Sequence, residues 1–226
     1  MLTNLLTIWS NPFDNAIEIA FSKFFDILPD FFKEFIIAFT NLGDKGIFFI
    51  VLGIFLLFMK KTRKLGFICL IGVILTLVIN DLILKNIFDR ARPFEDPNLV
   101  GSLVSITNNG GEVPGIKPDS NSFPSGHTFT SFTVIGGVSF MYIFNKEERK
   151  FYLPVMIFFI IFGILMAFSR VLVSHHYFTD VLAGAILGYG FGISSYYIVT
   201  YSPKLYYLVK EKYFSKNKEK ESNDNN

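Results

Sequence analysis

Charged residues are scarce in this chain of 226 residues. Asp, Glu, Lys and Arg make up only 18% of it, whereas hydrophobic residues make up 51%. A soluble domain usually carries about 25% charged residues, so the composition argues against an ordinary soluble enzyme and against a disordered chain. The net charge of +2 offers no basic surface for nucleic acid, and we expect no such partner. The apolar excess favours an integral membrane protein.

Cysteine is almost absent as well. The single cysteine, Cys69, lies inside an apolar run, so no intramolecular disulfide can form. We expect a free, buried thiol with a packing role.

Long apolar runs are abundant. A membrane-spanning helix needs about 20 mostly apolar residues, and five segments approach or reach this length without the alternation typical of barrel strands. They are residues 46–59, 65–84, 126–145, 151–169 and 181–203. The sequence therefore predicts an all-α fold, a polytopic transmembrane helical bundle whose core covers residues 46–203.

The two ends of the chain differ from this core. Over residues 1–45, apolar side chains recur with a period near 3.6 between charged ones, which predicts an amphipathic helical segment broken near Pro29. This segment could lie in the membrane interface or form a sixth helical element against the bundle, and the sequence leaves both open. Residues 204–226 are charged and low in complexity, which predicts a disordered cytoplasmic tail.

The basic residues predict an orientation in the cell membrane. Thirteen of the 21 lysines and arginines fall in residues 60–64, 146–150 and 204–220. By the positive-inside rule these segments face the cytoplasm. The connections at residues 85–125 and 170–178 then face the extracytoplasmic side.

Unusual polar residues gather on that predicted outer face. All three histidines and three of the five arginines lie within residues 85–93, 124–127 and 169–180. Charged groups near membrane depth are costly and usually functional. Each has a simpler explanation when taken singly, since Lys85 and Arg90 could snorkel to the interface and Asp180 could cap a helix. Taken together, those explanations would require every histidine to reach one face by coincidence.

The residue types in this cluster suit phosphate chemistry. Lys85, Arg92 and Arg170 would form a cationic pocket for a phosphate, whose oxygens gain charge during transfer. Ser125 and Gly126 begin a helix, and the free N–H groups there also favour an anion.

Two imidazoles and a carboxylate complete the cluster. His176 and Asp180 are four residues apart, a spacing that places them on one helix face. Asp180 could then fix the tautomer of His176 and leave its other ring nitrogen nucleophilic. His127 is suited to protonating a leaving oxygen.

Three motifs occur in order along the chain. They are Lys-x6-Arg-Pro at residues 85–93, Pro-Ser-Gly-His at residues 124–127 and Ser-Arg-x5-His-x3-Asp at residues 169–180. Together they resemble the signature of the type 2 phosphatidic acid phosphatase and vanadium haloperoxidase superfamily, with no position missing. The resemblance covers about residues 46–200, and it implies a helical bundle core and phosphate-ester hydrolysis without metal or cofactor.

The resemblance also implies a role for each matching residue. His176 would attack phosphorus and form a phosphohistidine, Asp180 would orient His176, and His127 would protonate the leaving group and then assist water. The residues that would hold the phosphate oxygens are Lys85, Arg92, Ser125, Gly126 and Arg170. His175 and Arg90 receive no role.

A site at the membrane–water boundary suits a phosphate carried by a membrane lipid. The layout, without an attached soluble domain, resembles small bacterial enzymes that act on undecaprenyl pyrophosphate or phosphatidylglycerophosphate, and phosphatidate is a third candidate. Two alternatives stay open: a haloperoxidase that holds vanadate, and a non-enzymatic protein that binds or transports a lipid headgroup. Residues 94–123 form a long connection, which either covers the site and helps select the headgroup or is a solvated loop. The sequence indicates no protein partner.

Overall fold

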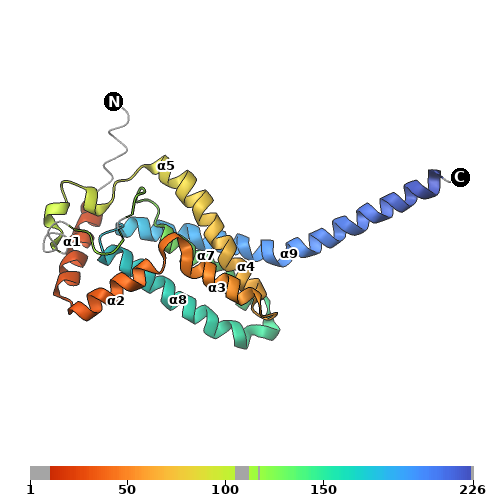
Figure 1. Cartoon of the computed structure of the whole chain (residues 1–226), viewed down its shortest axis with the longest axis horizontal. Helices are drawn as coiled ribbons and strands as arrows, with labels where there is room; N and C mark the ends of the chain where they lie inside the picture. The colour runs from red at the N-terminus through yellow and green to blue at the C-terminus, as the bar shows by residue number, and fades with distance from the viewer. Residues whose placement is uncertain (1–10, 105–111, 117, 225–226) are drawn as a thin grey trace, which may run out of the picture.

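The computed structural model describes residues 11–104, 112–116 and 118–224, and the regular structure in these residues is helical (Figure 1). The α-helices are α1 (Pro12–Ile27), α2 (Asp30–Asn41), α3 (Ile47–Leu57), α4 (Arg63–Leu75), α5 (Lys85–Phe88), α7 (Gly126–Phe144), α8 (Arg149–Leu172) and α9 (Phe178–Asp224). A π-helix, η2 (Thr76–Leu84), joins α4 to α5, and the short 3-10 turns are η1 (Asp44–Gly46), η3 (Pro93–Glu95), η4 (Val100–Ser102) and η5 (Lys146–Glu148).

The all-α transmembrane fold is confirmed, but the prediction of five spans is wrong. Among the described residues, three helical stretches are long and apolar enough to cross a membrane: Arg63–Glu95, Lys146–Leu172 and Phe178–Ser202. A fourth span exists only if Asp30–Asn41 and Asp44–Leu57, bent by 54°, cross the membrane as one broken span.

Two predicted spans account for the difference. The run at residues 46–59 forms α3, which has 11 residues and therefore extends only about 16 Å. It would need α2 to approach the roughly 30 Å of a bilayer core. The run at residues 126–145 forms α7, which has 19 residues but is rich in Ser, Thr and Gly. Most of α7 is buried against other helices, so its surface need not be as apolar as a helix that faces lipid.

Glycines set the distance between α7 and α9. A Cβ built on Gly188 would lie 2.3 Å from the carbonyl oxygen of Phe129, and one on Gly192 would lie 2.2 Å from that of Thr133. Such contacts are shorter than any real Cβ makes, so only glycine allows the two backbones to approach this closely. Small residues four apart are typical of close helix pairs in membranes. The beginnings of α7 and α9 are therefore held side by side.

The N-terminal helices α1 and α2 pack against the bundle through part of their apolar surface. Phe25 of α1 is buried beside Leu172 and Val173, and Phe39 of α2 stacks edge-on against Phe162 of α8 at 5.3 Å between ring centroids. The break between α1 and α2 lies at Pro29, as predicted. Residues 11–46 are thus part of the folded unit.

The basic turns meet at one end of the bundle. The ammonium group of Lys61, between α3 and α4, lies 4.5 Å from the ring centroid of Phe151 at the start of α8. The α3–α4 and α7–α8 turns therefore lie side by side, and Figure 1 shows both at the end away from α1 and α5.

The tail is helical, which corrects the prediction that it is disordered. Helix α9 continues to Asp224, and in Figure 1 this part projects away from the bundle. Lys and Glu dominate residues 209–221, and both are good helix formers. Low complexity alone therefore did not exclude a helix.

The glycine contacts predict a sharp difference between two neighbouring substitutions. Gly192→Ala should destabilise the protein by about 1–3 kcal/mol because the added methyl group meets backbone. Gly190→Ala is the control, because a Cβ there would have nothing within 4 Å and alanine favours helix. Thermal unfolding of the purified variants in detergent would measure this, and an unchanged melting temperature for Gly192→Ala would contradict the packing argument.

Candidate active site

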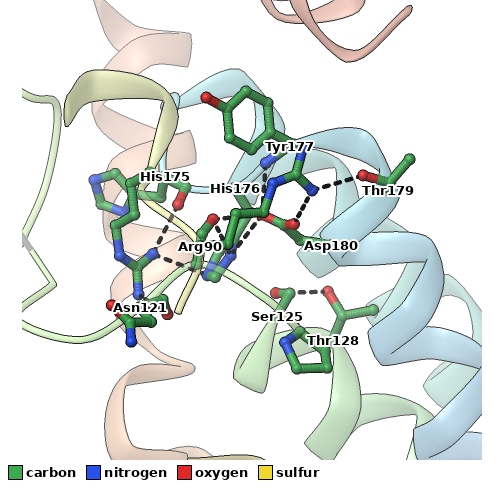
Figure 2. A network of polar contacts seen from close by, with 12 residues as sticks. Arg90, Asn121, Ser125, Thr128, His175, His176, Tyr177, Thr179 and Asp180 are labelled. Atoms are coloured by element: carbon green, nitrogen blue, oxygen red, sulfur yellow. Dashed lines mark hydrogen bonds and ion pairs between the residues drawn. The ribbon is translucent and has the colours of Figure 1, made fainter. Parts of the chain in front are cut away.

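The three motif segments converge at the end of the bundle opposite the basic turns. The backbone N–H of Ser125 donates to the carbonyl oxygen of Asp180 at 3.1 Å, which joins the start of α7 to the start of α9. Arg92 donates through Nη1 to the carbonyl oxygen of His175 at 2.7 Å, which joins the end of the first motif to the third. Figure 2 shows these segments meeting around His176.

His176 and Asp180 lie next to each other, both buried. His176 Nδ1 is 3.5 Å from Asp180 Oδ2. The same carboxylate oxygen accepts from the backbone N–H of Tyr177 at 2.9 Å and from the hydroxyl of Ser122. The Asp180 side chain is thus held by several donors while it faces the imidazole.

The other ring nitrogen of His176 lies 3.1 Å from Nη1 of Arg92. Because a guanidinium can only donate, Nε2 must be the acceptor and carries no proton. The remaining proton of a neutral ring is then on Nδ1, which lies 3.5 Å from Ser122 Oγ, its hydrogen-bond partner, and 3.5 Å from Asp180 Oδ2. This is the tautomer that a nucleophilic Nε2 requires.

Burial keeps the His176 imidazole neutral. Loss of solvation lowers its pKa well below the ordinary histidine value, and the positive charges of Arg92, Arg170 and Lys85 lower this pKa further. These three cations therefore lie close enough to act on the ring, which is 1% exposed. A neutral imidazole among cations is suited to attack an anionic group that those cations hold.

Arg92 is fixed mainly by backbone oxygens. Its Nε donates to the carbonyl of Ser120 at 2.6 Å and its Nη2 donates to that of Asn121 at 3.2 Å. Within the described residues no carboxylate lies within 4.0 Å of its guanidinium, so its charge is not neutralised by a direct ion pair. Lys85 differs, since its ammonium group lies 2.8 Å from Asp81 and donates to Ser120 Oγ at 3.1 Å.

Arg170 is, within the part of the chain that the structure describes, a second buried guanidinium without a direct ion pair. Its Nη1 donates to Thr40 Oγ1 at 2.9 Å, and its Nε has no hydrogen-bond partner in the described part of the protein. The residue is 1% exposed. An uncompensated buried charge is unfavourable, so this pair of guanidiniums favours an anion between them and His176.

His127 lies in the first turn of α7, directly after Gly126. Its Nε2 lies 3.3 Å from Asp44 Oδ1 in η1, close enough for an ion pair but not aligned as a hydrogen bond. Gly43 makes this approach possible, because a Cβ there would lie 2.3 Å from the imidazole. Asp44 therefore gives His127 a local acceptor.

Ser125 and Gly126 lie at the N-terminus of α7 as expected, but their contacts differ from a simple anion cradle. The N–H of Ser125 is already bonded to Asp180, and its Oγ accepts from Thr128 at 3.1 Å. The first N–H groups of the helix itself, beginning with Gly126, have no acceptor within the helix. A Cβ on Gly126 would make only ordinary contacts of 3.4 Å or more.

The sequence did not indicate several residues of this site. Thr40, Asp44 and Ser122 lie outside the motifs, in an amphipathic helix, a short turn and a long connection. In the sequence they look like ordinary polar residues, and only the packing of the bundle reveals that they contact motif residues. Among the described residues, no group of three or more His, Cys, Asp or Glu side chains could hold a metal ion.

Curated proteins resemble part of this chain. It is 31% identical over 133 residues to an undecaprenyl-diphosphatase of Sulfolobus acidocaldarius, a match that covers 59% of this chain and 54% of that protein. It is 32% identical over 135 residues to a probable lipid phosphate phosphatase 4 of Arabidopsis thaliana, covering 55% of this chain and 42% of that protein. The chain thus spans about half the length of the curated relatives it matches.

A solved structure shares the fold. The crystal structure of a transmembrane PAP2 type phosphatidylglycerolphosphate phosphatase from Bacillus subtilis matches with a TM-score of 0.57 and 24% identity, covering 87% of this chain and 89% of that one. The family model of the PAP2 superfamily matches residues 47–204, which include all three motifs and most of the chain. With these motifs meeting in one site, the chain belongs to the PAP2 superfamily.

Proposed function

We propose that this protein is a membrane lipid phosphatase that works through a phosphohistidine on His176. One observation carries the proposal: among the described residues, the buried guanidiniums of Arg92 and Arg170 lack a direct ion pair, and they lie beside a neutral imidazole whose unprotonated nitrogen faces Arg92. Simple headgroup binding would need the cations alone. A hydrolase also requires a nucleophilic imidazole, which Asp180 orients at His176, and a proton donor, which His127 can supply. A binding protein requires neither.

The proposed reaction has two steps. Phosphate oxygens bind Arg92, Arg170 and Lys85 and the free N–H groups at the start of α7. Nε2 of His176 attacks phosphorus, a P–N bond forms and the P–O bond to the leaving group breaks. His127 must enter this step protonated, and it gives that proton to the leaving oxygen. Water, deprotonated by His127, then breaks the P–N bond and releases phosphate. The Nδ1 proton stays directed at Asp180, which stabilises the positive ring.

A lipid phosphate is the substrate class that the comparisons support best. The names of the curated relatives refer to lipid phosphates and to undecaprenyl diphosphate, and the structural relative is described as a phosphatidylglycerolphosphate phosphatase. The candidates remain undecaprenyl pyrophosphate, phosphatidylglycerophosphate and phosphatidate. The motif end of the bundle, where apolar helices end in polar segments, suits a phosphate at headgroup depth.

We further propose that the motif end faces the outside of the cell membrane. The support is the separation of charge, because the turns rich in Lys and Arg meet at the other end of the bundle and such turns favour the cytoplasm.

Phosphate release from the three candidate lipids should persist in EDTA and disappear in His176→Ala. We expect a loss of at least 10³-fold in kcat, as for removal of other nucleophiles. His175→Ala is the matched control; it keeps the backbone carbonyl that binds Arg92 and should lose far less. An active His176→Ala protein, or strict dependence on a divalent metal, would overturn the mechanism.

The lowered pKa of His176 predicts an unusual pH profile. The attacking ring must be neutral, and a pKa below the ordinary value keeps it neutral as the pH falls through 6.5. The His176 contribution to kcat/KM should therefore stay constant from pH 8 to below 6.5 and decline only at lower pH. The titration of the substrate phosphate, near pH 6, is measured separately by phosphorus NMR and divided out. A remaining limb centred at 6.5 or above, on which kcat/KM declines as the pH falls, would contradict the burial argument, whereas a decline as the pH rises would report the general acid His127.

Cysteine labelling tests the orientation. The native Cys69 is fully buried, so a membrane-impermeant maleimide should report an introduced cysteine alone. Gly101→Cys, at an exposed position on the motif side, should react in intact cells. Glu147→Cys, in the exposed α7–α8 turn, should react only after permeabilisation, and the reverse pattern would refute the proposed orientation.

A further inference from the structure

Helix α1 carries a fully buried aspartate into the active site from outside the motifs. Asp14 is 0% exposed and precedes the region that matches the family model. Its carboxylate accepts from Arg90 Nη2 at 2.7 Å and from the N–H and hydroxyl of Thr179 at 3.1 and 2.6 Å. It also accepts from the side chain of Asn11 at 3.0 Å. A buried carboxylate with this many donors is held in one place.

Arg90 connects this aspartate to Asp180. Its Nη1 lies 2.5 Å from Asp180 Oδ1, while its Nη2 bonds Asp14. The guanidinium also lies 4.0 Å from the ring centroid of Tyr177, a cation–π contact that restricts its plane. Figure 2 shows Arg90 beside Asp180 and Tyr177.

The two oxygens of Asp180 have different partners. Oδ1 is bonded to Arg90, and Oδ2 faces the N–H of Tyr177, the hydroxyl of Ser122 and the ring of His176. By holding Oδ1, Arg90 therefore fixes the rotation of the Asp180 carboxylate. This rotation places Oδ2 of Asp180 opposite Nδ1 of His176. Asp14 accepts from Nη2 of Arg90. Asp14 and Asp180 therefore share the neutralisation of the Arg90 guanidinium charge.

We propose that Asp14 and Arg90 are positioning residues, which act through Asp180 to hold His176 in its reactive tautomer. Docked helix α1 is then part of the active site and not only a packing element. The inference rests on the proposed function, because it assumes that His176 is the nucleophile. A purely structural clamp would also explain the contacts, but it would affect stability and not the chemistry of His176.

A double-mutant cycle separates these two roles. We expect Asp14→Asn to lower kcat roughly tenfold with little change in KM, a size typical of coupling within one hydrogen-bonded network. The variant Asp14→Asn/Asp180→Asn should be no slower than Asp180→Asn alone, since Asp14 has nothing left to act on. Asp26→Asn is the control, because it makes the same change roughly 18 Å further along α1, and it should keep normal kcat.

Two kinetic outcomes would overturn the proposal. One is an unchanged kcat in folded Asp14→Asn. The other is a double variant whose loss is the product of the two single losses, because Asp14 would then act independently of Asp180. If Asp14→Asn does not fold, Arg90→Lys replaces it; lysine keeps the charge but cannot bridge both carboxylates in a fixed plane, so the same pattern is expected.

Nitrogen NMR tests the inference without any turnover. The chain has three histidines, so protein labelled with ¹⁵N-histidine in detergent gives few ring signals. For wild-type His176 we expect a protonated Nδ1 and a bare Nε2, and we expect Asp14→Asn or Arg90→Lys to mix the tautomers. An unmixed tautomer in both folded variants would refute the positioning role. If the wild-type protein hydrolyses no lipid phosphate but the two variants mix the His176 tautomers, the proposed function alone is refuted.

Discussion

Positive charge buried in an apolar bundle must be compensated, and this constraint organises the whole site. Arg90 is compensated by Asp14 and Asp180, and Lys85 by Asp81. Arg92 and Arg170 have hydrogen bonds but no direct carboxylate partner among the described residues. Because an unpaired buried charge is costly, the last two are best explained by an anion that arrives with the substrate. The pairing pattern thus assigns Arg90 to the framework of the site and leaves Arg92 and Arg170 as the main proposed phosphate ligands, with Lys85 shared between Asp81 and the phosphate.

The scaffold that holds these charges depends on close backbone contact. Gly188 and Gly192 allow α9 to approach α7, and the same contact brings Ser125 within hydrogen-bond distance of the Asp180 carbonyl. Packing deep in the bundle therefore places the start of α7, which carries His127, beside the start of α9, which carries Asp180 and closely follows His176. Rigid helices support the site, and the connections between them supply the donors that orient it.

The sequence predicted site residues that lie within short motifs. It did not predict residues that reach the site from distant parts of the chain. The three motif groups, including Lys85, Arg92 and His176, were expected to lie together, and they meet at one end of the bundle. Asp14 and Asp44 could not be found, because charged residues beside an amphipathic stretch look like a solvated face until tertiary packing buries them. The predicted number of membrane spans was wrong for a related reason. Helix α7 is rich in polar and small residues because neighbouring helices bury it, and the sequence alone does not show that burial.

In the proposed mechanism His176 becomes phosphorylated during turnover. Rapid acid-free quenching of the detergent-purified protein with a ³²P-labelled lipid phosphate would trap such an intermediate, and peptide mass spectrometry would locate the label. We predict label on His176, stable to alkali and lost in acid, with none in His176→Ala. Turnover with no protein-bound phosphate in wild type or in a His127→Ala variant, in which release of the intermediate should be slow, would contradict the account.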